Sequence, residues 1–276
     1  MSRVVNSYKN KDTRDVAGIM HMNNNRDNNS IASKEEKEND ESIAKLYEEN
    51  KINKSMLIKY MERKQKTACR GKIHLLVLLS SPIWIYYMLC LSKTTKAKIF
   101  TLVAMSCILF NAFASFLYHQ FEWTPKSFFL LEKMDHIGIF LMISYSTIPV
   151  PALLFNPVKL SIYIGLQLLM VLFGSFFICF STFSSGSRAL RTSVFVFAGF
   201  LHALFIKDLV TFLNLDEFVF LIMLAVFYII GAVIYSRKKP NLISGFLEFH
   251  DIFHICCLGS SICTFALNAS VLKRKT

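Results

Sequence analysis

The last apolar segment of the chain begins with residues 245–261, which read GFLEFHDIFHICCLGSS. It follows a basic cluster at residues 237–240 and stays apolar almost to the C-terminus, which is typical of a membrane-spanning helix. Residues four apart lie on the same helix face, so His250 and His254 present two imidazole rings to one point. Two histidines at this spacing can hold zinc, and ionisable side chains inside a membrane usually mark a functional site. The alternative is a pair of packing histidines that are hydrogen-bonded to backbone carbonyls or serines.

The composition excludes a soluble domain. Hydrophobic residues make up 53% of the 276 residues, and phenylalanine alone contributes 26, which is more apolar surface than a soluble domain of this size can cover. The net charge of +12 lies mostly in the N-terminal tail and between apolar runs, so it predicts no nucleic-acid partner. The seven cysteines include no C-x-x-C pair, and we expect reduced thiols. Cys257, three residues after His254, is a possible thiolate ligand that ranks below a third histidine.

Seven apolar runs follow the first 70 residues, each near the length that a bilayer requires. The sequence therefore predicts an all-α integral membrane protein, with a polar basic tail at residues 1–70 and a seven-helix bundle at residues 71–276. The fifth run is short and is interrupted by Gly199 and His202. The predicted spans are residues 73–91, 99–119, 128–149, 158–180, 192–206, 217–235 and 246–270.

The N-terminal tail has no apolar core of its own, and we expect disorder up to about Lys37. From Glu41 to Lys66, apolar residues recur at roughly helical spacing. Residues 51–72 carry eight basic residues and one acidic residue. This pattern favours either a basic amphipathic helix bound to anionic lipid at a membrane surface or a solvated charged linker.

The distribution of basic residues predicts the orientation of the bundle. With the N-terminus in the cytoplasm, the near-membrane tail and the loops on its side carry thirteen Lys and Arg, and the opposite side carries eight. Cytoplasmic segments are enriched in these residues, so the bias favours a cytoplasmic N-terminus and a C-terminus across the membrane. The basic residues 273–275 at the C-terminus argue against this orientation.

This topology brings polar residues from three helices to one membrane leaflet. The second span ends with Ser115 and His119 on one face, the third begins on the same side with Asp135, and the seventh begins there with His250 and His254. Three histidines leave a fourth zinc position open for water, which is the arrangement of a catalytic site. Asp135 could accept a proton from that water or orient it, and Ser115 could act as a supporting hydrogen-bond partner.

These motifs, S-x-x-x-H at 115–119, D-H at 135–136 and H-x-x-x-H at 250–254, resemble those of the hemolysin III family. The resemblance covers roughly residues 70–270. That family belongs to the broader group of progestin and adipoQ receptors and is related to the alkaline ceramidases.

The resemblance implies seven helices, a cytoplasmic N-terminus and a zinc ion near the cytoplasmic face. Its ligands would be His119, His250 and His254, with Asp135 and Ser115 beside the bound water. One departure lies at residues 145–149, YSTIP, because the family tends to have the proline directly after a threonine. This difference changes the kink of the third helix.

Three functional hypotheses follow. The first is a zinc-dependent hydrolase that cleaves a membrane lipid at an amide or ester bond, as a ceramidase-like enzyme would. The second is a pore-forming or membrane-lysing protein, which the name of the family implies, with a membrane lipid as its target. The third is a ligand-sensing receptor, suggested by the wider group. The spans contain no continuous strip of charged residues to line a wide pore, so the sequence favours the hydrolase.

Overall fold

The computed structural model describes residues 34–49, 51–61, 67, 69–180, 188–243 and 245–276, which are predominantly helical. The chain divides into two compact units, Met1–Leu57 and Ile58–Thr276. The boundary that the sequence predicts, at residue 70, falls inside the second unit.

The N-terminal part of the chain contains helix α2, Lys34–Glu48, and helix α3, Lys54–Met61. Two short helices therefore replace the single amphipathic helix expected from Glu41 onward. The break has a local cause, because the Asn53 side chain accepts a hydrogen bond from a backbone amide three residues later, as a helix cap does. Helix α2 also begins before the end of the expected disorder, since its lysines and glutamates favour a helix. Residues 1–33 lie outside the described residues.

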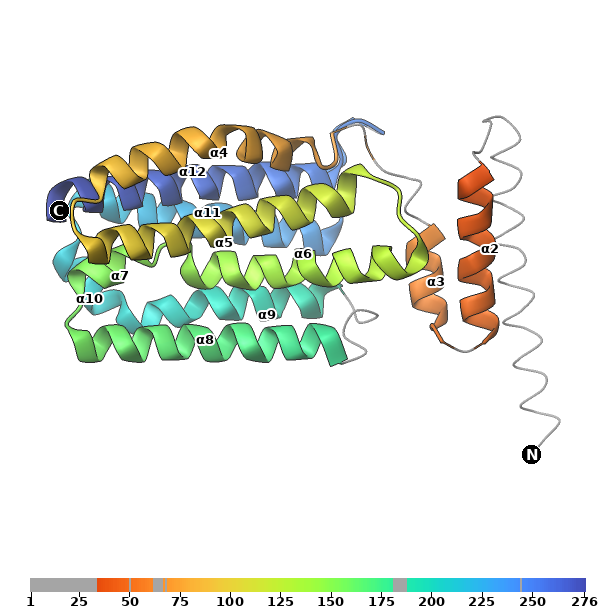
Figure 1. Ribbon diagram of the computed structural model, residues 1–276, viewed down its shortest axis with the longest axis horizontal. Helices are drawn as coiled ribbons and strands as arrows, with labels where there is room; N and C mark the ends of the chain where they lie inside the picture. The colour runs from red at the N-terminus through yellow and green to blue at the C-terminus, as the bar shows by residue number, and fades with distance from the viewer. Residues whose placement is uncertain (1–33, 50, 62–66, 68, 181–187, 244) are drawn as a thin grey trace. The chain divides into compact units, whose positions relative to one another are not determined.

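Within the part of the chain that the structure describes, seven segments are long and apolar enough to cross a membrane, which confirms the predicted seven-helix architecture. They run side by side in the second unit (Figure 1). In chain order they are α4 (Lys72–Leu91), α5 (Thr95–Gln120), α6 with α7 (Pro125–Tyr145 and Pro149–Leu154), α8 (Pro157–Phe180), α9 with the 3-10 helix η3 and α10 (Arg188–Phe200, Leu201–Phe205 and Ile206–Phe212), α11 (Leu215–Arg237) and α12 (Phe249–Lys275).

The third and fifth spans are interrupted. Helix α6 ends before a turn and α7 starts with Pro149, because proline cannot donate the amide hydrogen bond of a helix interior. The fifth span continues to Phe212, past its predicted end, because η3 connects α9 to α10. His202 in η3 receives a hydrogen bond from the Tyr163 hydroxyl at 2.9 Å and donates one to the Ile143 carbonyl at 3.0 Å. It is a packed, hydrogen-bonded residue.

Two glycines allow the helices around the start of α12 to approach closely. A Cβ on Gly138 would lie 2.9 Å from the Cα of Asn111, so α6 touches the backbone of α5 there. A Cβ on Gly231 would lie 3.1 Å from the Cys256 side chain and 3.3 Å from Phe253, so α11 packs tightly against α12. A larger residue at Gly138 would push α6 away from the backbone of α5, and one at Gly231 would require the Cys256 or Phe253 side chain to shift.

One apolar core of the second unit includes Leu267 and Val271 of α12 together with Ile108 of α5. Large apolar side chains on the outer faces of the bundle are exposed, such as Leu79 at 70% and Phe173 at 57%. Exposed apolar surface on this scale is what a lipid-facing helix requires and what a water-facing one avoids.

Candidate metal centre

Three histidines meet at the end of the bundle where α5 ends and α12 begins. His119 belongs to the last turn of α5, and His250 and His254 belong to the first two turns of α12. One ring nitrogen from each can be chosen so that all three lie within 4.8 Å of one another, which is close enough to hold one metal ion. The ring centroids are 4.7–5.0 Å apart. The structure thus brings together the three histidines that the sequence predicts as ligands.

Local sequence signals place these side chains. Helix α12 begins with a capping box, in which the Asp251 side chain accepts a hydrogen bond from the Glu248 backbone amide at 2.9 Å. The helix therefore starts at Phe249, and the two histidines follow one turn apart on one face. After α5, the indole of Trp123 donates a hydrogen bond of 2.9 Å to the Leu117 carbonyl and holds the turn that leads into α6.

Asp135 and Ser115 lie beside the histidines. An Asp135 carboxylate oxygen is 3.7 Å from Nε2 of His119, and both side chains are buried. The side chain of Ser115, 1% exposed, interacts with the Asp135 carboxyl group. Asp135 is therefore close to the histidine group without being one of its three members. The catalytic roles of Asp135 and Ser115 stay predictions.

The hydrogen bonding of His254 fits a metal ligand. This residue is 3% exposed, and its Nδ1 is 2.7 Å from Nε2 of His74. Its other ring nitrogen, Nε2, is buried and has no hydrogen-bond partner among the described residues. A buried imidazole nitrogen without a partner is costly, and a metal ion would satisfy it. Three neutral imidazole nitrogens form a ligand set that suits zinc and other late transition metals.

Comparison with known families accounts for most of the chain. The family model described as Haemolysin-III related matches residues 63–265. The chain belongs to this family. The matched range includes α4, α5, α6 and the first part of α12, and so contains every residue of the candidate metal centre. A search of curated proteins found no significant match.

In this haemolysin-III related protein, His74 lies beside the three histidines and was not predicted from the sequence. It is the third residue of α4 and is 6% exposed, with its ring packed edge-on against His254 at a centroid distance of 4.5 Å. A signal was present, since an ionisable residue inside a membrane span is a functional candidate by default. His136, next to Asp135 in sequence, stacks on Phe195 of α9.

A cavity of about 400 Å³ begins at the histidines and extends between α6, α9 and α11. Polar side chains line the end near His119, and apolar side chains line most of the remaining wall. Phe200, Ile222 and Ile229 line the cavity and are also 43–62% exposed, so its apolar wall reaches the outer surface between α9 and α11. Cys257 lines the cavity but does not belong to the group of three histidines that could hold a metal ion.

Proposed function

We propose that this haemolysin-III related protein is a zinc-dependent hydrolase that cleaves an amide or ester bond of a membrane lipid. The observation that supports this best is the position of Asp135, 3.7 Å from His119 at the edge of the three-histidine group. A hydrolase needs a proton acceptor next to its metal, and an ionisable side chain inside a membrane span is a functional candidate by default.

The cavity supports a lipid substrate. About 400 Å³ is within the range of small-molecule sites, and its predominantly apolar wall suits an acyl chain. Because exposed residues of α9 and α11 form part of this wall, a lipid could enter sideways from the bilayer with its carbonyl group toward the histidines.

The residues would divide the chemistry as follows. His119, His250 and His254 hold the zinc ion, each through one neutral nitrogen. Bound zinc supplies Lewis acidity, which polarises the substrate carbonyl and lowers the pKa of a water molecule to about 7. Asp135 accepts the proton of the attacking water and returns it to the leaving nitrogen or oxygen as the carbon–heteroatom bond breaks. Ser115 orients the Asp135 carboxylate.

A fatty-acid release assay tests this proposal. The purified protein is reconstituted in vesicles that contain a synthetic lipid amide or the matching ester. We expect free fatty acid to form, the reaction to stop when a chelator removes the metal, and the rate to return when zinc is added back. Zinc-loaded protein that releases no fatty acid from any amide or ester offered would contradict the proposal.

Membrane lysis is the second candidate function, because the description of the matched family names a haemolysin. Vesicles filled with a fluorescent dye separate the two functions. Dye release by the wild-type protein without any fatty-acid release would favour lysis over hydrolysis.

We further propose that the N-terminus is cytoplasmic and the C-terminus lies across the membrane. The support is the thirteen-to-eight bias in basic residues, together with an odd number of candidate spans in the described chain. Protease protection of tags at both ends in sealed vesicles checks this orientation. Tags protected on the same side would contradict it.

A further inference from the structure

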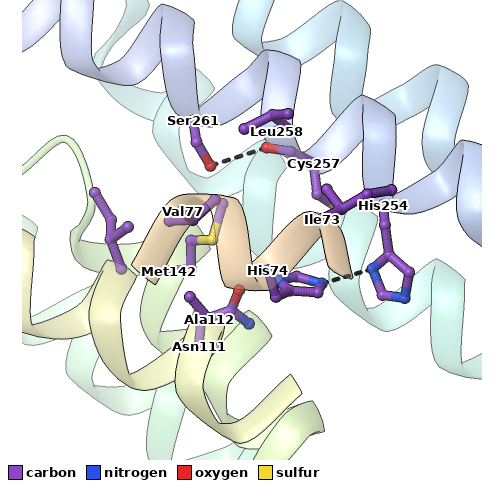
Figure 2. A pocket seen from close by; sticks show the side chains of 11 residues that line it. Ile73, His74, Val77, Asn111, Ala112, Met142, His254, Cys257, Leu258 and Ser261 are labelled. Carbon is purple, nitrogen blue, oxygen red and sulfur yellow. Dashed lines mark hydrogen bonds between the residues drawn. The ribbon is translucent and has the colours of Figure 1, made fainter. Parts of the chain in front are cut away.

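The pair formed by His74 and His254 links the first span to the helix that carries two of the three histidines. Nε2 of His74 lies 2.7 Å from Nδ1 of His254, and the two rings are nearly perpendicular (Figure 2). Both side chains are buried, at 6% and 3% exposure, so bulk water does not compete for this hydrogen bond. His74 itself is not one of the three histidines that could hold the metal ion.

The direction of this hydrogen bond decides whether His254 can bind a metal. A neutral imidazole carries one proton, on either Nδ1 or Nε2. If His74 donates to Nδ1 of His254, the proton of His254 sits on Nε2 and that nitrogen cannot be a ligand. If His254 donates from Nδ1 instead, its Nε2 has a free lone pair. That same Nε2 is buried and has no hydrogen-bond partner within the described part of the chain.

We propose that His74 is a positioning residue for the metal centre. It accepts a hydrogen bond from Nδ1 of His254 and so fixes the tautomer and the ring orientation in which Nε2 of His254 binds the metal. Metal-binding histidines commonly donate their second ring nitrogen in this way, and loss of the acceptor weakens metal binding about 10–100-fold. This inference rests on the metal site of the proposed function.

The segment before α4 contacts α12 at a second point. The Thr67 hydroxyl lies 2.7 Å from both carboxylate oxygens of Asp251, which is fully buried. Asp251 and His254 are three residues apart, so they lie on neighbouring positions of one helix face. The first span and its leading segment therefore hold the start of α12 at two adjacent positions, which limits rotation of the helix about its axis.

The surroundings of His74 guide the choice of variants. A small cavity of about 10 Å³, lined also by Asn111 and Ser261, lies on one side of it (Figure 2), and His74 also lines the cavity of about 400 Å³. A much smaller side chain would leave a void and confuse a lost hydrogen bond with lost packing. His74→Leu keeps most of the volume and removes the acceptor. His74→Gln keeps an acceptor oxygen near the position of Nε2, and His74→Asn has the same amide on a shorter side chain.

Zinc affinity, measured by competition with a chromophoric chelator in detergent, tests the inference without any activity assay. We expect His74→Leu and His74→Asn to weaken zinc binding about 10–100-fold, and His74→Gln to recover most of the affinity. The control is Met88→Ala, which loosens the buried packing of α4 near its other end. This variant should unfold at a lower temperature and bind zinc as the wild type does.

Wild-type affinity in His74→Leu would overturn the positioning role and leave the metal site intact. Equal weakening in His74→Leu and Met88→Ala would also overturn it, because the effect would then be one of general packing. A His74→Gln variant as weak as His74→Leu would rule out the hydrogen bond as the cause. If the wild-type protein binds no zinc, the metal site fails, and this inference fails with it.

Discussion

The two ends of helix α12 carry buried polar groups that differ in how completely they are satisfied. Near its C-terminus, Arg274 forms an ion pair with Glu217 of α11, with an Nη2–Oε2 distance of 2.6 Å. Both carboxylate oxygens of Glu217 have further donors, from the Ser270 hydroxyl and the Asn214 backbone amide. Near the N-terminus of α12, by contrast, Nε2 of His254 is buried and lacks a partner among the residues that the structure describes.

This difference separates a structural cluster from a binding site. Glu217 is fully buried, yet its partners come entirely from the protein, so the cluster needs no ligand to be stable. The histidine group borders a cavity of about 400 Å³, and Nε2 of His254 has no hydrogen-bond partner among the described residues. A polar group that is buried in a membrane without a full set of partners indicates that something else completes it.

The largest expected effect is on metal content. His250→Ala removes one of three ligands, so we expect zinc content to fall sharply and the thermal unfolding temperature to drop to that of chelator-treated wild type, because bound metal stabilises only the folded state. Differential scanning fluorimetry with metal analysis measures both. His202→Ala is the matched control: it removes another histidine inside the membrane, and its stability should fall while zinc is retained. Full zinc content in His250→Ala would contradict the ligand assignment.

The next effect is on turnover. Asp135→Asn keeps the size of the side chain and some hydrogen bonding but removes the proton acceptor. We expect fatty-acid release to slow by about 10²–10⁴-fold while zinc content and fold are retained. Asp208→Asn is the control, since Asp208 pairs with Lys159 at 2.5 Å and does not line the cavity. An unchanged hydrolysis rate in zinc-loaded Asp135→Asn would remove Asp135 from the mechanism, and unimpaired dye release by this variant would support lysis as a separate activity.

The smallest effect is confined to stability and sharpens the contrast between the two ends of α12. Arg274→Met leaves the Glu217 carboxylate buried without its cation, which should cost about 3 kcal/mol of unfolding free energy. Glu217→Gln should cost less, because the Arg274 side chain is 28% exposed and can reach water. The double variant, Arg274→Met with Glu217→Gln, should be more stable than Arg274→Met alone. None of these variants should alter the zinc content, and a loss of zinc in Arg274→Met would mean that the two ends of α12 are not independent.

The sequence was sufficient to predict the spans and the meeting of the histidines. Alternating span directions place the end of α5 and the start of α12 on one side of the membrane, so His119, His250 and His254 had to lie at similar depth. Helical periodicity then placed His250 and His254 on the same face of α12, because they are four residues apart. The depth of a residue and its face both follow from its position along a helix, and hydropathy determines that position well.

Features that depend on tertiary packing could not be predicted in this way. The contact between His74 and His254 depends on how far α4 is rotated about its own axis, and an almost uniformly apolar span does not determine that rotation. The length of the fifth span depends on η3, where His202 finds its partners on two other spans. The cavity depends on the separation of α9 and α11, which is a property of the packed bundle.

Metal analysis of detergent-purified protein is the most direct test of the three-histidine centre. The wild type, and a variant in which His119, His250 and His254 are all replaced by Ala, are purified side by side and equilibrated with zinc before the free metal is removed. We expect about one zinc ion per wild-type chain and almost none in the triple variant. Zinc at wild-type occupancy in the triple variant, or a folded wild type that retains no zinc, would contradict the assignment of these three histidines as a metal centre.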